Sequence, residues 1–473
     1  MLFNSLDFLF FFILVFIVYW SSSNKYKWVI LLICSYFFYA YWNPIYIILL
    51  FLSTFIDYFF SLYYTSSTNP FKKKLGIFIS LFLNFGLLFS FKYYNFFTEG
   101  LNLLISSLTS HEMVFPQYSI LLPLGISFYT FQTVSYAIDV YRGTIPAEKN
   151  LGKFALYISF FPQLVAGPIE RAGSLLPQIN EPKKVLDMHS FSSGIRLILW
   201  GLFLKVVVAD NLADLVSAKF NYVESQTGGA LFFALFLFAF QLYSDFNGYS
   251  KMAMGLAQLL GFKLMNNFNY PFVSSSFNEF WKRWHISLSQ WIRDYVFIPL
   301  GGTRGKTIKI VLTIFITFFV VGLWHGATIN YVLWGVLSGL LLIGEFLLTK
   351  YIIKNLSWWK KLKLLKIAVV FFLFCLSIVP IRSISFNDCI LVYEKLLYLK
   401  ISDVYFWFAD NRYSPGMLGL YVLIFIELWF GLELNSKFNL KNKFTNYAFY
   451  LLIFFMILLL GRDTGTQFIY FQF

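Results

Sequence analysis

The sequence predicts an all-α polytopic membrane protein with about 11–12 transmembrane helices and some re-entrant or interfacial helices. Of its 473 residues, 59% are hydrophobic and 13% are charged, about half the charged share of a soluble domain. Many apolar runs reach ~17–25 residues, the length that crosses a bilayer as a helix. The runs are continuous and do not alternate, so they predict helices and not barrel strands.

The apolar runs follow one another along the whole chain. They lie near 2–20, 28–42, 45–64, 75–97, 120–140, 190–209, 229–260, 308–324, 331–349, 364–380, 417–434 and 446–460. The first run has no basic region before it and no small-residue cleavage site, which predicts a permanent span. The interrupted stretches 151–171 and 272–302 are expected to be re-entrant or interfacial. Residues 1–473 are therefore predicted to form a single integral-membrane domain, with an aromatic C-terminal tail at 461–473.

Lysine and arginine predict the orientation. With about twelve crossings, the Lys- and Arg-rich loops all fall on one side of the membrane, the cytoplasmic side, and both termini fall outside. These loops account for the net charge of +14, with some attraction to anionic lipid. A basic face on a soluble module, as nucleic-acid binding requires, is not found. The three cysteines are scattered and indicate neither a disulfide framework nor a metal site.

The stretch 277–305, FNEFWKRWHISLSQWIRDYVFIPLGGTRG, places His285 among aromatic and basic residues. On a helical wheel one face is apolar, formed by Phe277, Phe280, Trp281, Trp284, Leu288 and Trp291. One interpretation is an interfacial helix with tryptophan anchors and snorkelling cations. The other is a cavity walled by the aromatic residues, with His285 inside and cations at its mouth that attract a phosphorylated acyl donor. The donor-binding candidates are Trp281, Lys282, Arg283, Trp284, Arg293 and Arg304.

His325 ends a long apolar run, in GLWHG at 322–326. The run carries no charge from Ile310 to Trp324, so this imidazole is expected at membrane depth, where ionisable groups are functional candidates. Gly322 and Gly326 allow another chain segment or a substrate to approach closely. A buried histidine bonded to a carbonyl is one interpretation. The other is a general base, because an imidazole can take a hydroxyl proton near neutral pH.

Several motifs together resemble the membrane-bound O-acyltransferase (MBOAT) family, in its bacterial branch of alginate and peptidoglycan O-acetyltransferase membrane subunits and the teichoic-acid D-alanylation protein. The resemblance runs from about residue 30 to the C-terminus. It is carried by PLGISFYTFQTVSYAIDVYRG, FFPQLVAGPIER, QLYSDFNGYSKMAMGLAQLLGF, FWKRWHISLSQWIRDYVFIPLGG and GLWHGATINYVLWG. It implies that His325 matches the family's invariant histidine and His285 its second motif residue.

The resemblance also implies a fold and a reaction. Tilted and broken helices would form a ring with a central funnel, in the bacterial inner membrane. A cytoplasmic thioester, acetyl-CoA or an acyl-carrier protein, would give its acetyl group, and no bound cofactor or metal is expected. An extracytoplasmic partner O-acetyltransferase would place the group on a polysaccharide. Peptidoglycan is placed slightly ahead of an alginate-like exopolysaccharide as acceptor, with cellulose and teichoic acid open.

Two further features leave alternatives open. The tail GRDTGTQFIYFQF either packs on the helix bundle, or resembles a C-terminal motif whose tyrosine, here Tyr470, carries the acyl group after activation by His325. Asp245, in SDFNGY, either lines the funnel or bonds a neighbouring helix end. A transporter or flippase for a lipid-linked sugar remains a second function, although no inverted repeat is found. A noncatalytic envelope scaffold is the third.

Overall fold

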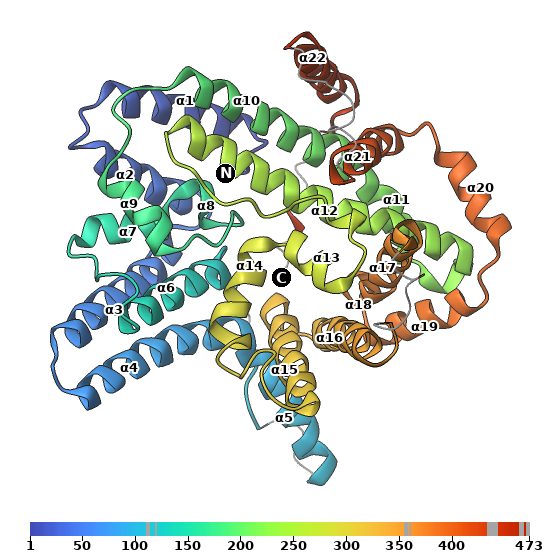
Figure 1. The fold of residues 1–473 in the computed structure, drawn as a ribbon, viewed down its shortest axis with the longest axis horizontal. Coiled ribbons are helices and arrows are strands. Elements are labelled where there is room, and N and C mark those ends of the chain that lie inside the picture. Colours follow the sequence, from blue (N-terminus) through green and yellow to red (C-terminus); the bar gives the residue numbers. More distant parts are fainter. Residues whose placement is uncertain are drawn as a thin grey trace. The chain divides into compact units, whose positions relative to one another are not determined.

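The computed structural model describes residues 1–109, 114–118, 121–353, 358, 361–432, 443–462 and 468–469. The described residues form α-helices with short 3₁₀ and π segments, and no strand is found among them (Figure 1). They group into two compact units, residues 1–195 with 253–265, and residues 196–252 with 266–473. The prediction of a single domain stays a prediction.

The first unit contains the N-terminal helices. They are α1 (Leu6–Ser21), α2 (Lys27–Ala40), α3 (Ile47–Ser66), α4 (Pro70–Leu88), α5 (Tyr94–Leu108), α6 (Ile126–Tyr141), α7 (Leu151–Ser159), α8 (Phe161–Leu164) and α9 (Ala172–Asn180). A π segment, η2 (Phe89–Tyr93), joins α4 to α5, and a 3₁₀ turn, η1 (Pro44–Tyr46), precedes α3. The unit boundary falls inside α10 (Met188–Leu202) and α12 (Gly228–Leu259).

The second unit contains the remaining helices. They are α11 (Asp210–Phe220), α13 (Phe277–Arg283), α14 (Ile286–Ile292), α15 (Thr307–His325), α16 (Ile329–Tyr351), α17 (Lys363–Ser377), α18 (Val379–Arg382), α19 (Phe386–Leu397), α20 (Ile401–Asn411), α21 (Pro415–Gly431) and α22 (Lys443–Leu460). Its short segments are η3 (Phe203–Ala209), η4 (Val223–Ser225), η5 (Pro271–Val273) and η6 (Arg293–Phe297). η3 and η6 are π-helical.

The predicted class, an all-α polytopic membrane protein, is confirmed. Seven helices among the described residues are long and apolar enough to cross a membrane, or eight if α20 and α21, which meet at 105°, form one bent span. This is fewer than the predicted number of spans. The apolar runs near 2–20 and 28–42, for example, fold as helices of 16 and 14 residues. Both are shorter than the ~20 residues that a perpendicular crossing needs. Apolar composition therefore locates these helices without fixing their ends.

The hairpin of α15 and α16 positions His325, and glycines set its spacing. The two helices lie side by side in the second unit (Figure 1). A Cβ at Gly322 would come within 2.6 Å of the Tyr331 carbonyl oxygen, and a Cβ at Gly335 within 2.5 Å of the Phe318 carbonyl oxygen. Small residues let membrane helices approach closely and gain packing energy. The approach predicted at Gly322 is thus made by a neighbouring helix.

A buried polar cluster ties α3, α4 and α6 together in the first unit. The Asp57 carboxylate, fully buried, accepts hydrogen bonds from Ser80 and from Nδ2 of Asn84, the latter at 3.0 Å to each oxygen. The Asn84 carbonyl oxygen in turn accepts from Ser53 at 2.9 Å and from Thr133 at 3.3 Å. Polar groups at membrane depth need such partners, so this cluster stabilises helix packing.

Candidate active site

The helix around His285 is broken at the histidine. α13 ends at Arg283 and α14 begins at Ile286, and His285 between them has a φ of +42°. Residues other than glycine rarely occupy the left-handed region. Such a conformation costs about 1–3 kcal/mol and persists only where the surrounding contacts hold it. The continuous helical wheel drawn across 277–291 is therefore wrong at this point. The break changes the direction in which the imidazole projects.

Asn267 holds the break in place. Its carbonyl oxygen accepts a hydrogen bond from the Ile286 N–H at 2.8 Å, and its Oδ1 accepts from the Ser287 N–H at 3.2 Å. These two N–H groups belong to the first turn of α14, which has no partner for them within the helix. Asn267 Nδ2 donates to the Ser250 hydroxyl on α12 at 3.2 Å. Asn267 is fully buried, so it fixes the His285 turn against α12.

Aromatic rings surround both imidazoles. His285 is 2% exposed and makes a perpendicular contact with Phe246, with ring centroids 4.6 Å apart and planes at 86°. His325 is 8% exposed and makes similar perpendicular contacts with Trp324 at 4.8 Å and Trp334 at 4.7 Å. Perpendicular arrangements suit the charge distribution of aromatic rings. The rings restrict imidazole rotation, which keeps each ring nitrogen in a defined direction.

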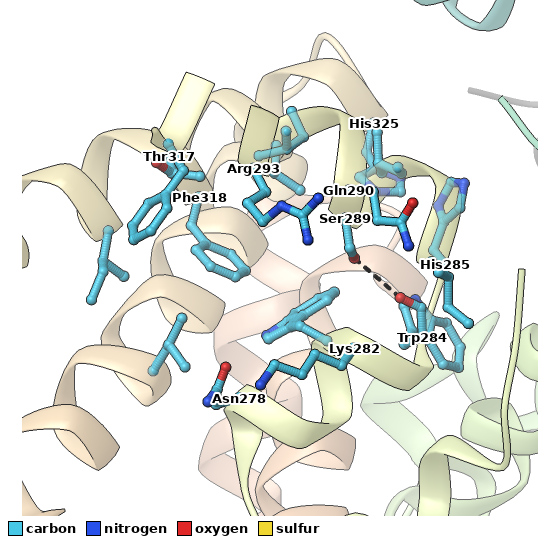
Figure 2. A pocket seen from close by; sticks show the side chains of 18 residues that line it. Asn278, Lys282, Trp284, His285, Ser289, Gln290, Arg293, Thr317, Phe318 and His325 are labelled. Atoms are coloured by element: carbon cyan, nitrogen blue, oxygen red, sulfur yellow. Dashed lines mark hydrogen bonds between the residues drawn. The ribbon is translucent and has the colours of Figure 1, made fainter. Parts of the chain in front are cut away.

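Both histidines line one cavity of about 360 Å³ in the second unit (Figure 2). α13, α14, η6, α15 and α16 all contribute to its wall. The apolar lining residues are Trp281, Trp284, Ile286, Leu288, Ile292, Phe297, Ile314, Phe318, Val321 and Leu342. The polar ones are Asn278, Lys282, Ser289, Gln290, Arg293 and Thr317. Apolar walls with a few convergent polar groups are typical of small-molecule sites.

The polar groups are not spread evenly around the cavity. In Figure 2, His285 and His325 lie on the side of Trp284 and Gln290, while Lys282 and Asn278 lie together at the lower edge of the view. A ligand of moderate length could therefore place a reactive end at the histidines and an anionic part at Lys282.

A second, smaller cavity touches His325. It measures about 20 Å³ and is lined by Leu242, Trp284, His325, Tyr331, Trp334, Phe374, Ile378 and Ile381. Its volume is enough for about one water molecule. His325 and Trp284 line both cavities. The imidazole therefore lies between a large, partly polar cavity and a small apolar one.

Four of the six donor-binding candidates line the large cavity, namely Trp281, Lys282, Trp284 and Arg293. Arg283 is directed elsewhere, because it forms an ion pair with Glu279 at 2.8 Å and donates to the Asn269 carbonyl at 3.3 Å. Arg304 lies in the exposed turn before α15 and is not among the lining residues. Tyr470 lies outside the described residues.

Carboxylates fix the orientation of α13, which carries Asn278, Trp281 and Lys282. Glu345 on α16 accepts the N–H of Phe277 at the helix start, where a negative charge also suits the helix dipole. Glu279 accepts from the Ser275 N–H at 2.9 Å and from its hydroxyl at 3.0 Å. Burial acts to raise the pKa of Glu279, but the Ser275 hydrogen bonds and the Arg283 charge outweigh it and lower that pKa. Both carboxylates stabilise the cavity wall.

Sequence reasoning missed several residues of the site. Asn278, Ser289, Gln290 and Thr317 line the cavity, and Phe246, Trp324 and Trp334 frame the two histidines. Trp324 and Trp334 stand in the motif around His325, so their proximity to it was available from the sequence. Phe246 is far from His285 along the chain, and only the fold brings them together. Within the described residues, no group of three His, Cys, Asp or Glu side chains is placed to hold a metal ion.

Comparison with known proteins identifies the class. A model of the MBOAT, membrane-bound O-acyltransferase family, matches residues 145–384, about half of the chain, and this stretch includes both histidines. The chain belongs to the membrane-bound O-acyltransferase family. The resemblance and the acyltransferase class predicted from the motifs are thus confirmed, and they agree with a buried imidazole in a cavity.

Three relatives show the range of functions near this chain. A probable alginate O-acetylase of Pseudomonas aeruginosa is 42% identical over 73% of this chain and 66% of its own length. The peptidoglycan O-acetyltransferase of Helicobacter pylori is 34% identical over 66% of this chain and 63% of its own length. A teichoic acid D-alanyltransferase of Streptococcus thermophilus is 32% identical over 46% of this chain and 56% of its own length. The chain thus spans about two thirds, or less, of the length of each of these relatives.

Proposed function

We propose that this protein is a membrane O-acetyltransferase that takes an acetyl group from a cytoplasmic thioester and exports it for O-acetylation of an extracytoplasmic polysaccharide. The observation that carries the proposal is the shared cavity of His285 and His325, with Lys282 and Arg293 in its wall. A buried imidazole held by aromatic rings can serve as a base that faces this cavity. Family membership supplies the class of reaction.

His325 acts as the general base in this proposal. It takes the proton of an attacking hydroxyl, whose oxygen forms a bond to the thioester carbonyl carbon while the carbon–sulfur bond breaks. The proton then passes to the departing thiolate, so that the products are an ester and a free thiol. A neutral imidazole can accept a hydroxyl proton, and such catalysis typically contributes about 10²–10⁴-fold to a rate. His285, which lines the same cavity, is proposed to bind the carbonyl group or to shape its surroundings.

Lys282 and Arg293 are proposed to bind the phosphorylated part of the donor. The structure supports this role because both line the cavity and are the cationic members of its wall. Arginine matches phosphate geometry and lysine acts as a point charge. Acetyl-CoA is the proposed donor, and an acyl-carrier protein has the same phosphopantetheine thioester chemistry. Donor entry from the cytoplasm is part of the proposal and rests on the predicted orientation, in which the Lys- and Arg-rich loops are cytoplasmic and both termini lie outside.

Tyr470 is proposed to carry the acetyl group after the first transfer. His325 would take the phenolic proton, and the phenolic oxygen would attack the thioester. A tyrosyl ester would let the acetyl group cross the membrane while the donor stays behind. An extracytoplasmic partner O-acetyltransferase would then move the acetyl group to a sugar hydroxyl. The position of Tyr470 one residue after Ile469, which is anchored in the second unit, supports testing this residue first.

The acceptor is proposed to be an alginate-like exopolysaccharide, with peptidoglycan second. This reverses the order favoured by the motifs alone. The alginate O-acetylase relative is 42% identical and the peptidoglycan enzyme 34% identical, and the former match covers more of this chain. Identity of this size supports an order of testing. It leaves the acceptor itself to experiment.

The experiment is to express the chain with its genetic neighbours and measure base-labile acetate on purified exopolysaccharide and cell wall. Wild type is compared with His325→Ala at matched protein levels in the membrane. We expect acetate on one polymer in wild type and its loss in the variant. Equal acetate in both strains would remove His325 as the base and favour a transporter or a scaffold. The polymer that carries the acetate identifies the acceptor.

A further inference from the structure

Three ionisable side chains form a buried cluster in the second unit, apart from the histidine cavity. The Lys205 ammonium lies 2.8 Å from Asp210 Oδ1 and 2.7 Å from Asp245 Oδ1. All three residues are at most 4% exposed. Charges buried in a membrane protein are costly unless they are paired, and they usually mark a functional element. We call Lys205, Asp210 and Asp245 the buried triad.

The local backbone explains how Lys205 enters this cluster. It lies in the π-helical segment η3, which runs directly into α11 at Asp210. A π segment shifts the direction of the following side chains and often occurs at functional sites. Asn211, next to the triad, donates to the Val206 carbonyl at 3.1 Å and to the Leu460 carbonyl at 3.0 Å. The end of α22 is thus fastened to the same segment.

The chain after α22 returns to the triad. The Arg462 N–H donates to the Val206 carbonyl at 3.0 Å, and the Ile469 N–H donates to Asp245 Oδ2 at 2.7 Å. Asp245 therefore binds Lys205 through one oxygen and the C-terminal segment through the other. A buried carboxylate needs donors on both oxygens, so the Ile469 N–H completes its coordination.

Phe468 adds an apolar contact beside this hydrogen bond. It is 1% exposed and stacks on Tyr249 with ring centroids 5.0 Å apart, and it lies 5.7 Å from Phe246. Phe246 also makes the perpendicular contact with His285. Phe246 thus lies between the docked C-terminal residue and an imidazole of the candidate active site.

We propose that the buried triad is the docking site of the C-terminal segment. Asp245 is a positioning residue that anchors Ile469 while Phe468 packs beside the ring that contacts His285. The function of this anchor is to hold Phe468 and Ile469 beside Phe246, the ring that contacts His285 of the acyl-transfer site. Only this positioning role rests on the proposed acetyl transfer; the docking itself is independent of it.

Hydrogen exchange of the full-length protein in detergent tests the docking. The Ile469 amide, half-buried and bonded to the buried Asp245 carboxylate, should exchange slowly in wild type. In Asp245→Asn the Lys205 ammonium binds the amide oxygen of the new side chain, so the Nδ2 group faces the Ile469 N–H. An amide NH₂ group cannot accept a hydrogen bond, and the Ile469 N–H therefore loses its acceptor. We expect exchange about tenfold faster or more, with thermal unfolding still cooperative. Unchanged exchange in Asp245→Asn would overturn the docking.

The positioning role is tested by a pair of variants that leave the triad intact. Ile469→Pro removes the N–H donor, and Ile469→Ala keeps it. We expect kcat for acetate transfer to fall about tenfold or more in Ile469→Pro, with KM for acetyl-CoA unchanged, and to be retained in Ile469→Ala. Equal rates in both variants, in a protein whose wild type transfers acetate, would overturn the positioning role. If the wild-type protein transfers no acetate, the proposed function is contradicted. The docking would then be judged by the hydrogen-exchange experiment alone.

Discussion

Two buried polar regions at membrane depth contrast in what their groups contact. The Asp57 cluster of the first unit is closed, because hydroxyl and amide donors from neighbouring helices bind the carboxylate. The histidines of the second unit instead line a 360 Å³ cavity that also contains Lys282 and Arg293. A polar residue at membrane depth is a functional candidate in both regions. The two regions differ in what the polar groups face. The Asp57 carboxylate is bonded by other side chains, whereas the two imidazoles face a cavity that a substrate can enter.

The largest effect is expected at the histidines. His325→Ala should lower the rate of acetate transfer about 10²–10⁴-fold, because the general base is lost. Thermal unfolding should change little, since the residue borders cavities on two sides. Initial rates in membranes with matched protein levels measure this, and Leu348→Ala, at an exposed position of α16 outside both cavities, is the control. A His325→Ala protein with a wild-type rate would contradict the assignment.

Asp57→Ala should show the opposite pattern. It leaves Ser80 and Asn84 without their buried acceptor, and each such loss costs about 1–3 kcal/mol. The free energy of unfolding should therefore fall by about 2–5 kcal/mol, while the rate per folded molecule stays near wild type. Thermal unfolding in detergent measures the loss of stability, and transfer rates normalised to the amount of folded protein measure the activity per folded molecule. A large loss of specific activity at unchanged stability would mean that the Asp57 cluster belongs to the reaction.

Asn267→Ala tests whether the strained turn at His285 matters. The substitution removes the acceptor of the Ser287 N–H and the donor to Ser250, so the imidazole loses its fixed direction. We expect kcat to fall about tenfold with KM for the donor retained, since misplacement acts on the reacting geometry. Asn266→Ala, one residue earlier, is the matched control. If kcat is the same for Asn267→Ala and Asn266→Ala, the turn at His285 is held by other contacts.

The cations should give the smallest effect. Lys282→Ala and Arg293→Ala should each raise KM for acetyl-CoA about three- to tenfold with kcat retained, because each loses about 1 kcal/mol of partly screened attraction. The difference from wild type should shrink as salt is added. Arg283→Ala and Arg304→Ala are the controls, since neither side chain lines the cavity. A KM change in the controls equal to that in Lys282→Ala would indicate a general surface charge effect.

The sequence was informative about composition and motif chemistry, and less so about geometry. The helical membrane class followed from apolar runs, and both histidines with four donor-binding candidates came from motifs within single segments. The break at His285 was missed because the aromatic spacing continues across it, while the hydrogen bonds that stabilise it come from Asn267. Arg283 was included with its neighbouring cations as a donor-binding candidate. It forms an ion pair with Glu279, a pair that the helical spacing of the sequence permits, and it is not among the residues that line the cavity.

Long-range contacts account for the other gaps. Phe246 reaches His285, and Asp245 reaches Lys205 and Ile469, over separations that no local pattern records. Asp245 was expected either to line the funnel or to bond a neighbouring helix end; it bonds the Lys205 ammonium and the Ile469 N–H. Among the described residues, seven or eight helices are long and apolar enough to cross a bilayer, and three further apolar helices, Leu6–Ser21, Lys27–Ala40 and Tyr447–Leu460, are shorter.

The most direct test of the account is whether the thioester donor occupies the cavity of His285 and His325. A cysteine introduced by Ser289→Cys lies in its wall, and one introduced by Ser107→Cys, on the exposed surface of α5, is the control. Maleimide labelling of each site is followed by peptide mass spectrometry at increasing acetyl-CoA concentration. The account predicts that labelling at position 289 slows as acetyl-CoA saturates transfer, while position 107 is unaffected. Unchanged labelling at position 289, at concentrations that sustain acetate transfer, would contradict it.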